Sequence, residues 1–178
     1  MNNMERLRRI SRIMAWLSLA SAVLYLAGEV CVYIFPDLSS AVDFIQIRNG
    51  VMPVTSTTPL AFRVAALAVD LIPAGLVVWA LIALHRLFSL YGKGEVFSSA
   101  ALAALNRVAV LMFWEVLVSI VAQVPVSFLL SWSTKQHAIS VGLGSGDFTF
   151  LFMAGVVLTI ARVMGEARRV ADENASFV

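Results

Sequence analysis

Four long apolar segments dominate this chain, and each is long enough to cross a lipid bilayer as a helix. They lie at about 13–35, 59–90, 99–131 and 147–169. A helix of about 20 residues spans the hydrocarbon core, and a helix satisfies its own backbone hydrogen bonds there. We therefore expect an all-α, polytopic membrane protein: one integral membrane domain over 1–178, built as a four-helix transmembrane bundle.

The composition agrees with this class. Hydrophobic residues make up 60% of the chain and charged residues only 13%, against about a quarter charged in a typical soluble domain. These values exclude a disordered chain and a soluble nucleic-acid-binding domain. We expect the lipid bilayer as the main partner and no direct binding of nucleic acid.

The single cysteine, Cys31, lies inside the first apolar segment. It cannot form a disulfide within the chain, and neither His85 nor His137 has a second ligand at metal-binding spacing. The sequence predicts no metal site and no cofactor. The basic N-terminus resembles a signal peptide, but the apolar run that follows continues far enough to span the membrane, so we expect an uncleaved anchor.

The distribution of positive charge predicts the orientation. Ten of the 13 Lys and Arg residues lie in the N-terminal tail, the loop between the second and third segments, and the C-terminal end. Because cytoplasmic flanks are enriched in Lys and Arg, we expect both termini in the cytoplasm of a multi-pass protein of the bacterial inner membrane. On the opposite side, Asn49-Gly50 lies between apolar residues and predicts a small external hairpin.

The loop between the second and third segments carries strong local signals. Gly92 or Gly94 is suited to end the preceding helix in a left-handed conformation. Ser98 is placed to cap the helix that follows. A tight helix-to-helix turn accounts for these residues, and a docking surface for a cytoplasmic partner is compatible with the same turn. The candidate docking residues are Tyr91, Gly94, Val96, Phe97 and Ser98.

The chain resembles the bacterial domain-of-unknown-function family 2975. The resemblance is carried by the four segments, by the loop pattern Tyr-x-x-Gly-x-Val-Phe-Ser at 91–98, by Ala-Arg-Val-Met-x-Glu-Ala at 161–167, and by Asp-Glu-Asn at 172–174. It extends from the first segment to the C-terminus. It implies no assigned activity and no catalytic residues. Some members resemble this chain and are encoded beside small helix-turn-helix regulators, which implies a membrane partner for such a regulator.

Polar side chains inside apolar segments are costly and are candidates for function. Glu29, Asp70 and Gln123 each lie roughly 9–10 Å below the same predicted boundary of the membrane, by the helical rise per residue. We expect them to form a buried polar cluster. The cluster would either join helices through hydrogen bonds or serve a proton- or cation-linked function, with Arg63 or a bound ion between the two acids; side chains that do not meet are the third alternative.

Glu115 and Arg162 are opposite charges at similar depth near the other boundary, in the third and fourth segments. We expect a buried ion pair between these helices. Removing one partner of such a pair leaves the other charge in a medium of low dielectric constant, so its expected role is structural.

Three functions are compatible with these sequence features. The first is a regulatory or scaffolding membrane protein that contacts a helix-turn-helix regulator or another membrane protein through the cytoplasmic loop and the C-terminal region 168–178. The second is an oligomeric proton- or cation-linked transporter or channel that uses Glu29, Asp70 and Gln123; a homo-oligomer is required because four spans without an inverted repeat make a poor monomeric transporter. The third is a membrane enzyme. The sequence contains no Ser/His/Asp set, metal cluster or phosphate loop that would favour it.

Overall fold

A computed structural model gives the fold and describes residues 3–39, 54–132, 139 and 141–175. The hairpin expected at Asn49-Gly50 lies outside the described residues. The described elements are α1 (Asn3–Ile34), α2 (Pro36–Ser39), α4 (Leu60–Lys93), α5 (Ser99–Trp132) and α6 (Ser145–Ala175). All these elements are helices, and no strand occurs among the described residues, which confirms the all-α class.

The four long helices are each long and apolar enough to cross a membrane, so the chain is a multi-pass membrane protein. Each helix also extends beyond the expected span. The 34 residues of α4 and of α5 rise by about 51 Å, whereas the hydrocarbon core is about 30 Å thick. The helices therefore carry polar ends outside the hydrocarbon, most visibly in α1, which starts at Asn3, and in α6, which continues to Ala175.

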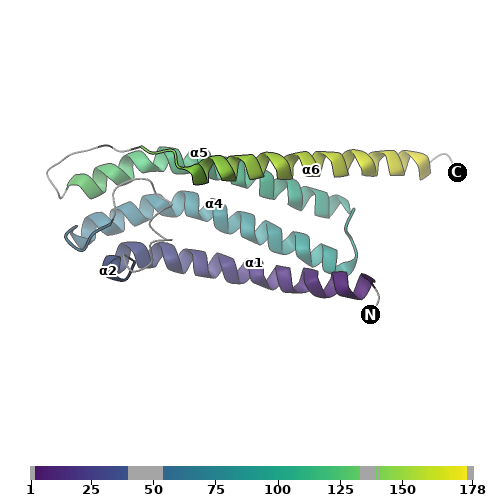
Figure 1. The fold of residues 1–178 in the computed structure, drawn as a ribbon, viewed down its shortest axis with the longest axis horizontal. Coiled ribbons are helices and arrows are strands. Elements are labelled where there is room, and N and C mark those ends of the chain that lie inside the picture. Colours follow the sequence, from purple (N-terminus) through teal and green to yellow (C-terminus); the bar gives the residue numbers. More distant parts are fainter. Residues whose placement is uncertain (1–2, 40–53, 133–138, 140, 176–178) are drawn as a thin grey trace.

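The helices pack in chain order. α4 lies between α1 and α5, and α6 packs along the far side of α5 (Figure 1). α5 is the most enclosed of the four helices, because 39% of the residues in its most apolar 18-residue stretch are buried. α6 is the least enclosed, with 11% of the residues in the corresponding stretch buried. α6 thus forms one edge of the bundle, and most of its apolar side chains face outward toward lipid.

Small residues line the contacts between helices. Ala66 is fully buried and Ala101 is 1% exposed, whereas Val121 is 71% exposed. Alanines allow close helix approach, and large apolar side chains gain nothing by leaving lipid for the interior. One apolar cluster joins Tyr33 of α1, Ala66 of α4 and the neighbouring part of α5.

The beginning of α1, the connection from α4 to α5 and the end of α6 lie at the same end of the molecule (Figure 1). This arrangement follows from an even number of antiparallel spans. It brings the loop at 91–98 to the same end as the C-terminal part of α6, the two regions that are expected from the sequence to contact a partner.

Candidate functional sites

The connection from α4 to α5 is a well-defined turn. Gly94 adopts a left-handed conformation with φ of 89°. Its N–H donates to the carbonyl oxygen of Tyr91 at 3.0 Å, and the N–H of Glu95 donates to that of Leu90 at 3.0 Å. This pair of bonds is the Schellman motif that closes a helix C-terminus. Of the two glycines considered from the sequence, Gly94 is the one that ends the helix.

Ser98 caps the start of α5. Its Oγ accepts a hydrogen bond from the N–H of Ala101 at 3.1 Å, the geometry of an N-cap. Val96 is half-buried beside it, whereas the side chain of Phe97 is 62% exposed. The turn therefore needs Gly94 and Ser98 for its conformation, and Phe97 is the large apolar residue that it leaves uncovered.

The C-terminal part of α6 contacts this turn directly. Nη1 of Arg168 donates to the carbonyl oxygen of Phe97 at 3.1 Å. The next residue, Arg169, forms ion pairs along its own helix with Glu166 and Glu173. We call residues 91–98 together with 168–175 the loop–helix surface. The sequence predicts a docking role for both the loop and the C-terminal part of α6, but the contact between them depends on how α6 packs.

Two of the three residues of the expected polar cluster meet. The half-buried carboxyl groups of Glu29 on α1 and Asp70 on α4 interact, including a side-chain hydrogen bond. Asp70 Oδ2 also accepts a hydrogen bond from the hydroxyl of Tyr33 at 3.1 Å. Tyr33 was missed from the sequence, although it lies four residues after Glu29 on the same helical face.

Gln123 has a different partner. Its Oε1 accepts a hydrogen bond from the backbone N–H of Gly142 at 2.8 Å. Gln123 thereby ties α5 to the segment that leads into α6. The side chain of Gln123 lies at the same expected membrane depth as Glu29 and Asp70, but its amide oxygen binds the segment that connects α5 to α6.

Arg63, considered from the sequence as a cation for the acids, lies over the C-terminal end of α1. Its Nη1 donates to the carbonyl oxygens of Tyr33 and Ile34, each at 3.4 Å. These carbonyls belong to the last turn of a helix, which has no N–H donors of its own for them. Arg63 therefore acts as a C-terminal cap for α1, next to Tyr33 and its hydrogen bond to Asp70.

The ion pair expected between Glu115 and Arg162 stays a prediction. Glu115 is buried on α5, with 6% exposure, and Arg162 is exposed on α6. Glu115 also lies within electrostatic range of Glu29. Within the described ranges, no three His, Cys, Asp or Glu residues are arranged to hold a metal ion.

A family model with the description "Protein of unknown function (DUF2975)" matches residues 50–178 of the chain. The chain belongs to the DUF2975 family. The matched region contains α4, α5, α6 and the whole loop–helix surface. It begins after α1, so Glu29 and Tyr33 lie outside it, although the resemblance drawn from the sequence began at the first segment. No curated protein and no solved structure matches this DUF2975 chain.

Proposed function

We propose that this DUF2975 protein is a regulatory or scaffolding protein of the bacterial cytoplasmic membrane that binds a cytoplasmic partner through the loop–helix surface. The observation that carries the proposal is the hydrogen bond from Arg168 to the Phe97 carbonyl. This bond joins two segments far apart in the chain into one surface at one end of the bundle.

The orientation in this proposal places both termini and the loop–helix surface in the cytoplasm. The end of the molecule that holds them carries ten of the 13 Lys and Arg residues. Positive charge is retained on the cytoplasmic side during insertion. The surface is then accessible to a soluble protein.

The chemistry of the surface suits protein recognition. Phe97 offers an exposed aromatic ring, and the side chains of Arg169, Glu166 and Glu173 surround the neighbouring part of α6 with charge. An aromatic anchor within a polar rim is typical of binding hot spots. The partner we propose is the helix-turn-helix regulator that the family resemblance implies; another membrane protein is the second partner class.

The test measures binding of a helix-turn-helix regulator, of the kind that the family resemblance implies, to the protein in lipid nanodiscs. We expect wild-type protein to bind and Phe97→Ala to weaken binding at least about ten-fold, the range of a hot-spot residue. Val110→Ala is the matched control, because Val110 is also exposed but faces outward from α5. Equal binding by wild type and the Phe97 variant would refute docking through this surface.

A second candidate function rests on the contact between Glu29 and Asp70. Two interacting carboxyl groups inside a membrane protein form an element that can bind and release a proton or a cation. The test is proton flux into liposomes that contain the protein. Glu29→Gln with Asp70→Asn is expected to abolish the flux, whereas Glu5→Gln, a change at an exposed acid near the start of α1, leaves it intact. Absence of flux in wild type refutes this second function.

A further inference from the structure

A cavity of about 560 Å³ lies between α4 and α5 at the end where the two helices are joined. It exists because three of the side chains that α5 presents there are small, Ala100, Ala103 and Ala104. The cavity is separate from the Glu29 and Asp70 contact and borders the loop–helix surface, with which it shares Lys93. Neither candidate function uses it.

The cavity is lined by cations. Arg86 and Lys93 come from α4 and Arg107 from α5, and its lining contains no acidic residue. Within the part of the chain that the structure describes, no hydrogen bond or ion pair is formed by the side chains of these three cations. Three like charges around one space repel one another, so an anion in that space would lower the electrostatic energy.

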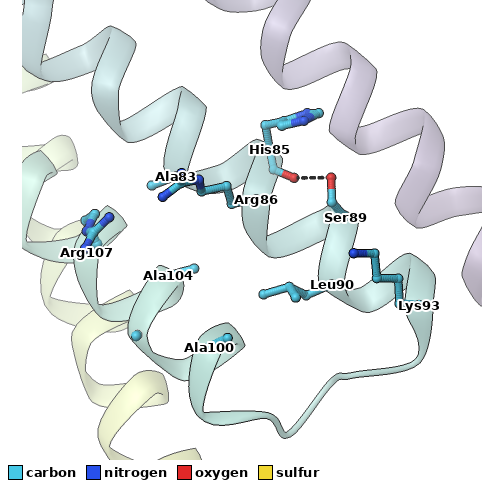
Figure 2. Close-up of a pocket in the computed structure, with 10 residues that line it drawn as sticks. Ala83, His85, Arg86, Ser89, Leu90, Lys93, Ala100, Ala104 and Arg107 are labelled. Atoms are coloured by element: carbon cyan, nitrogen blue, oxygen red, sulfur yellow. Dashed lines mark hydrogen bonds between the residues drawn. The ribbon is translucent and has the colours of Figure 1, made fainter.

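The side chains are oriented for such a ligand. Arg86 reaches from α4 toward α5, on the side where Arg107 stands, and Leu90 points into the space between the helices (Figure 2). His85 turns the other way, toward α1, because its Nδ1 donates to the carbonyl oxygen of Ala15 at 2.9 Å. The two guanidinium groups, with Lys93 farther along α4, therefore define the charged part of the cavity.

The cavity also lies at the expected level of the lipid headgroups. Arg86 is near the end of 64–88, the most apolar part of the second segment, and Arg107 comes directly before 108–130, the most apolar part of the third segment. Arginines at such positions place their charge at the boundary and their alkyl part along the apolar surface. A ligand that carries both a negative headgroup and apolar chains matches this arrangement, with Leu90 and the alanines against its apolar part.

We propose that this cavity binds the phosphate group of an anionic ligand, held by Arg86 and Arg107 with Lys93 as an additional charge. Guanidinium groups bind phosphate oxygens through paired hydrogen bonds. The phosphate can come from an anionic phospholipid of the surrounding membrane or from a free phosphate compound. Basic pockets between transmembrane helices at the membrane boundary are known to accept anionic headgroups.

The test is a native mass spectrometry titration of the detergent-solubilised full chain. The probes are phosphatidylglycerol, the zwitterionic lipid phosphatidylethanolamine, and inorganic phosphate. We expect phosphatidylglycerol to bind more tightly than phosphatidylethanolamine. Arg86→Gln and Arg107→Gln are each expected to weaken phosphatidylglycerol binding about five-fold, and the double variant about 25-fold, from the contribution of one basic residue near an anionic lipid.

Three controls keep the result specific. Arg12→Gln removes the same charge from an exposed position on α1 outside the cavity and is expected to bind like wild type. The double variant Arg86→Lys with Arg107→Lys keeps the charge and is expected to retain most of the binding. Circular dichroism and gel filtration show whether each variant is folded, and an unfolded glutamine variant is replaced by Ala104→Leu, which fills the cavity and is expected to exclude the lipid.

Competition between phosphatidylglycerol and inorganic phosphate distinguishes the two sources of the phosphate group. Phosphatidylglycerol that is not displaced by millimolar inorganic phosphate identifies a lipid site. Displacement by phosphate, with phosphate bound in the absence of lipid, identifies a free phosphate compound; both results support the cavity as an anion site. The proposal is overturned if neither phosphatidylglycerol nor inorganic phosphate binds. It is also overturned if the glutamine variants and the Ala104→Leu variant bind like wild type, or if Arg12→Gln loses as much binding as the glutamine variants of the cavity do.

Discussion

Nη1 of Arg168 donates a hydrogen bond to the carbonyl oxygen of Phe97 across 71 positions of sequence, at 3.1 Å. The bond connects the last helix, at the edge of the bundle, to the turn between the two central helices. Because α6 has little other burial, with 11% of its most apolar window enclosed, this contact contributes to where its C-terminal part lies. It is the feature on which the proposed docking surface depends.

Replacing Arg168 with alanine is expected to loosen the turn without unfolding the bundle. One exposed hydrogen bond is lost, so amide hydrogen exchange at 94–101 is expected to rise by up to about five-fold. Hydrogen exchange followed by mass spectrometry measures this. Arg169→Ala is the matched control, because the ion pairs of Arg169 stay within α6; equal protection of 94–101 in wild type and the Arg168 variant would contradict the assigned role.

Gly94→Ala is expected to destabilise the protein by about 1 kcal/mol, since the left-handed conformation is strained for alanine. Apart from the two adjacent residues, nothing lies within 4 Å of the added Cβ, so the cost is conformational. The expected fall in Tm is about 2–4 °C. Gly92→Ala tests the reasoning: its Cβ would make an ordinary 3.9 Å contact with Ser11, and alanine favours the helix, so its Tm should hold or rise.

Ser98→Ala is expected to destabilise the start of α5 by about 1 kcal/mol through loss of the N-cap. Ser99→Ala, one position later, removes a hydroxyl from an exposed residue and should leave the thermal unfolding midpoint unchanged. Phe97→Ala should also leave it unchanged, because the ring is largely exposed. A stability loss in Phe97→Ala equal to that in Ser98→Ala would mean that the ring supports the fold. The exposed ring would then no longer support a docking role for Phe97.

Tyr33→Phe is expected to remove the hydrogen bond to Asp70 while keeping the ring packed. A double-mutant cycle with Asp70→Ala, which removes the acceptor, isolates the pair, and a coupling energy of about 0.6–1.7 kcal/mol is expected from hydrogen bonds between transmembrane helices. Unfolding of the four proteins in mixed detergent micelles supplies the data. Strictly additive effects would show that the two groups do not interact in the folded protein.

The local features of the chain could be predicted from its sequence because they depend on neighbours in sequence. Four apolar stretches specify four helices in a membrane, where no other backbone arrangement of a lone span satisfies its hydrogen bonds. Gly94 and Ser98 likewise follow from the conformational needs of a helix end and a helix start. Depth along the membrane normal also follows from the helical rise, and it placed Glu29 and Asp70 at the same level.

The tertiary structure decided which groups at one level meet, because depth leaves the rotation and order of the helices undetermined. Glu29 and Asp70 meet because α1 packs on α4, whereas Gln123 at similar depth binds Gly142. Tyr33 joins Asp70, and Arg168 joins Phe97, only through helix packing. The cation-lined cavity has the same origin: Arg86 and Arg107 are apart in sequence, and the small alanines of α5 leave space between them once α4 and α5 lie side by side.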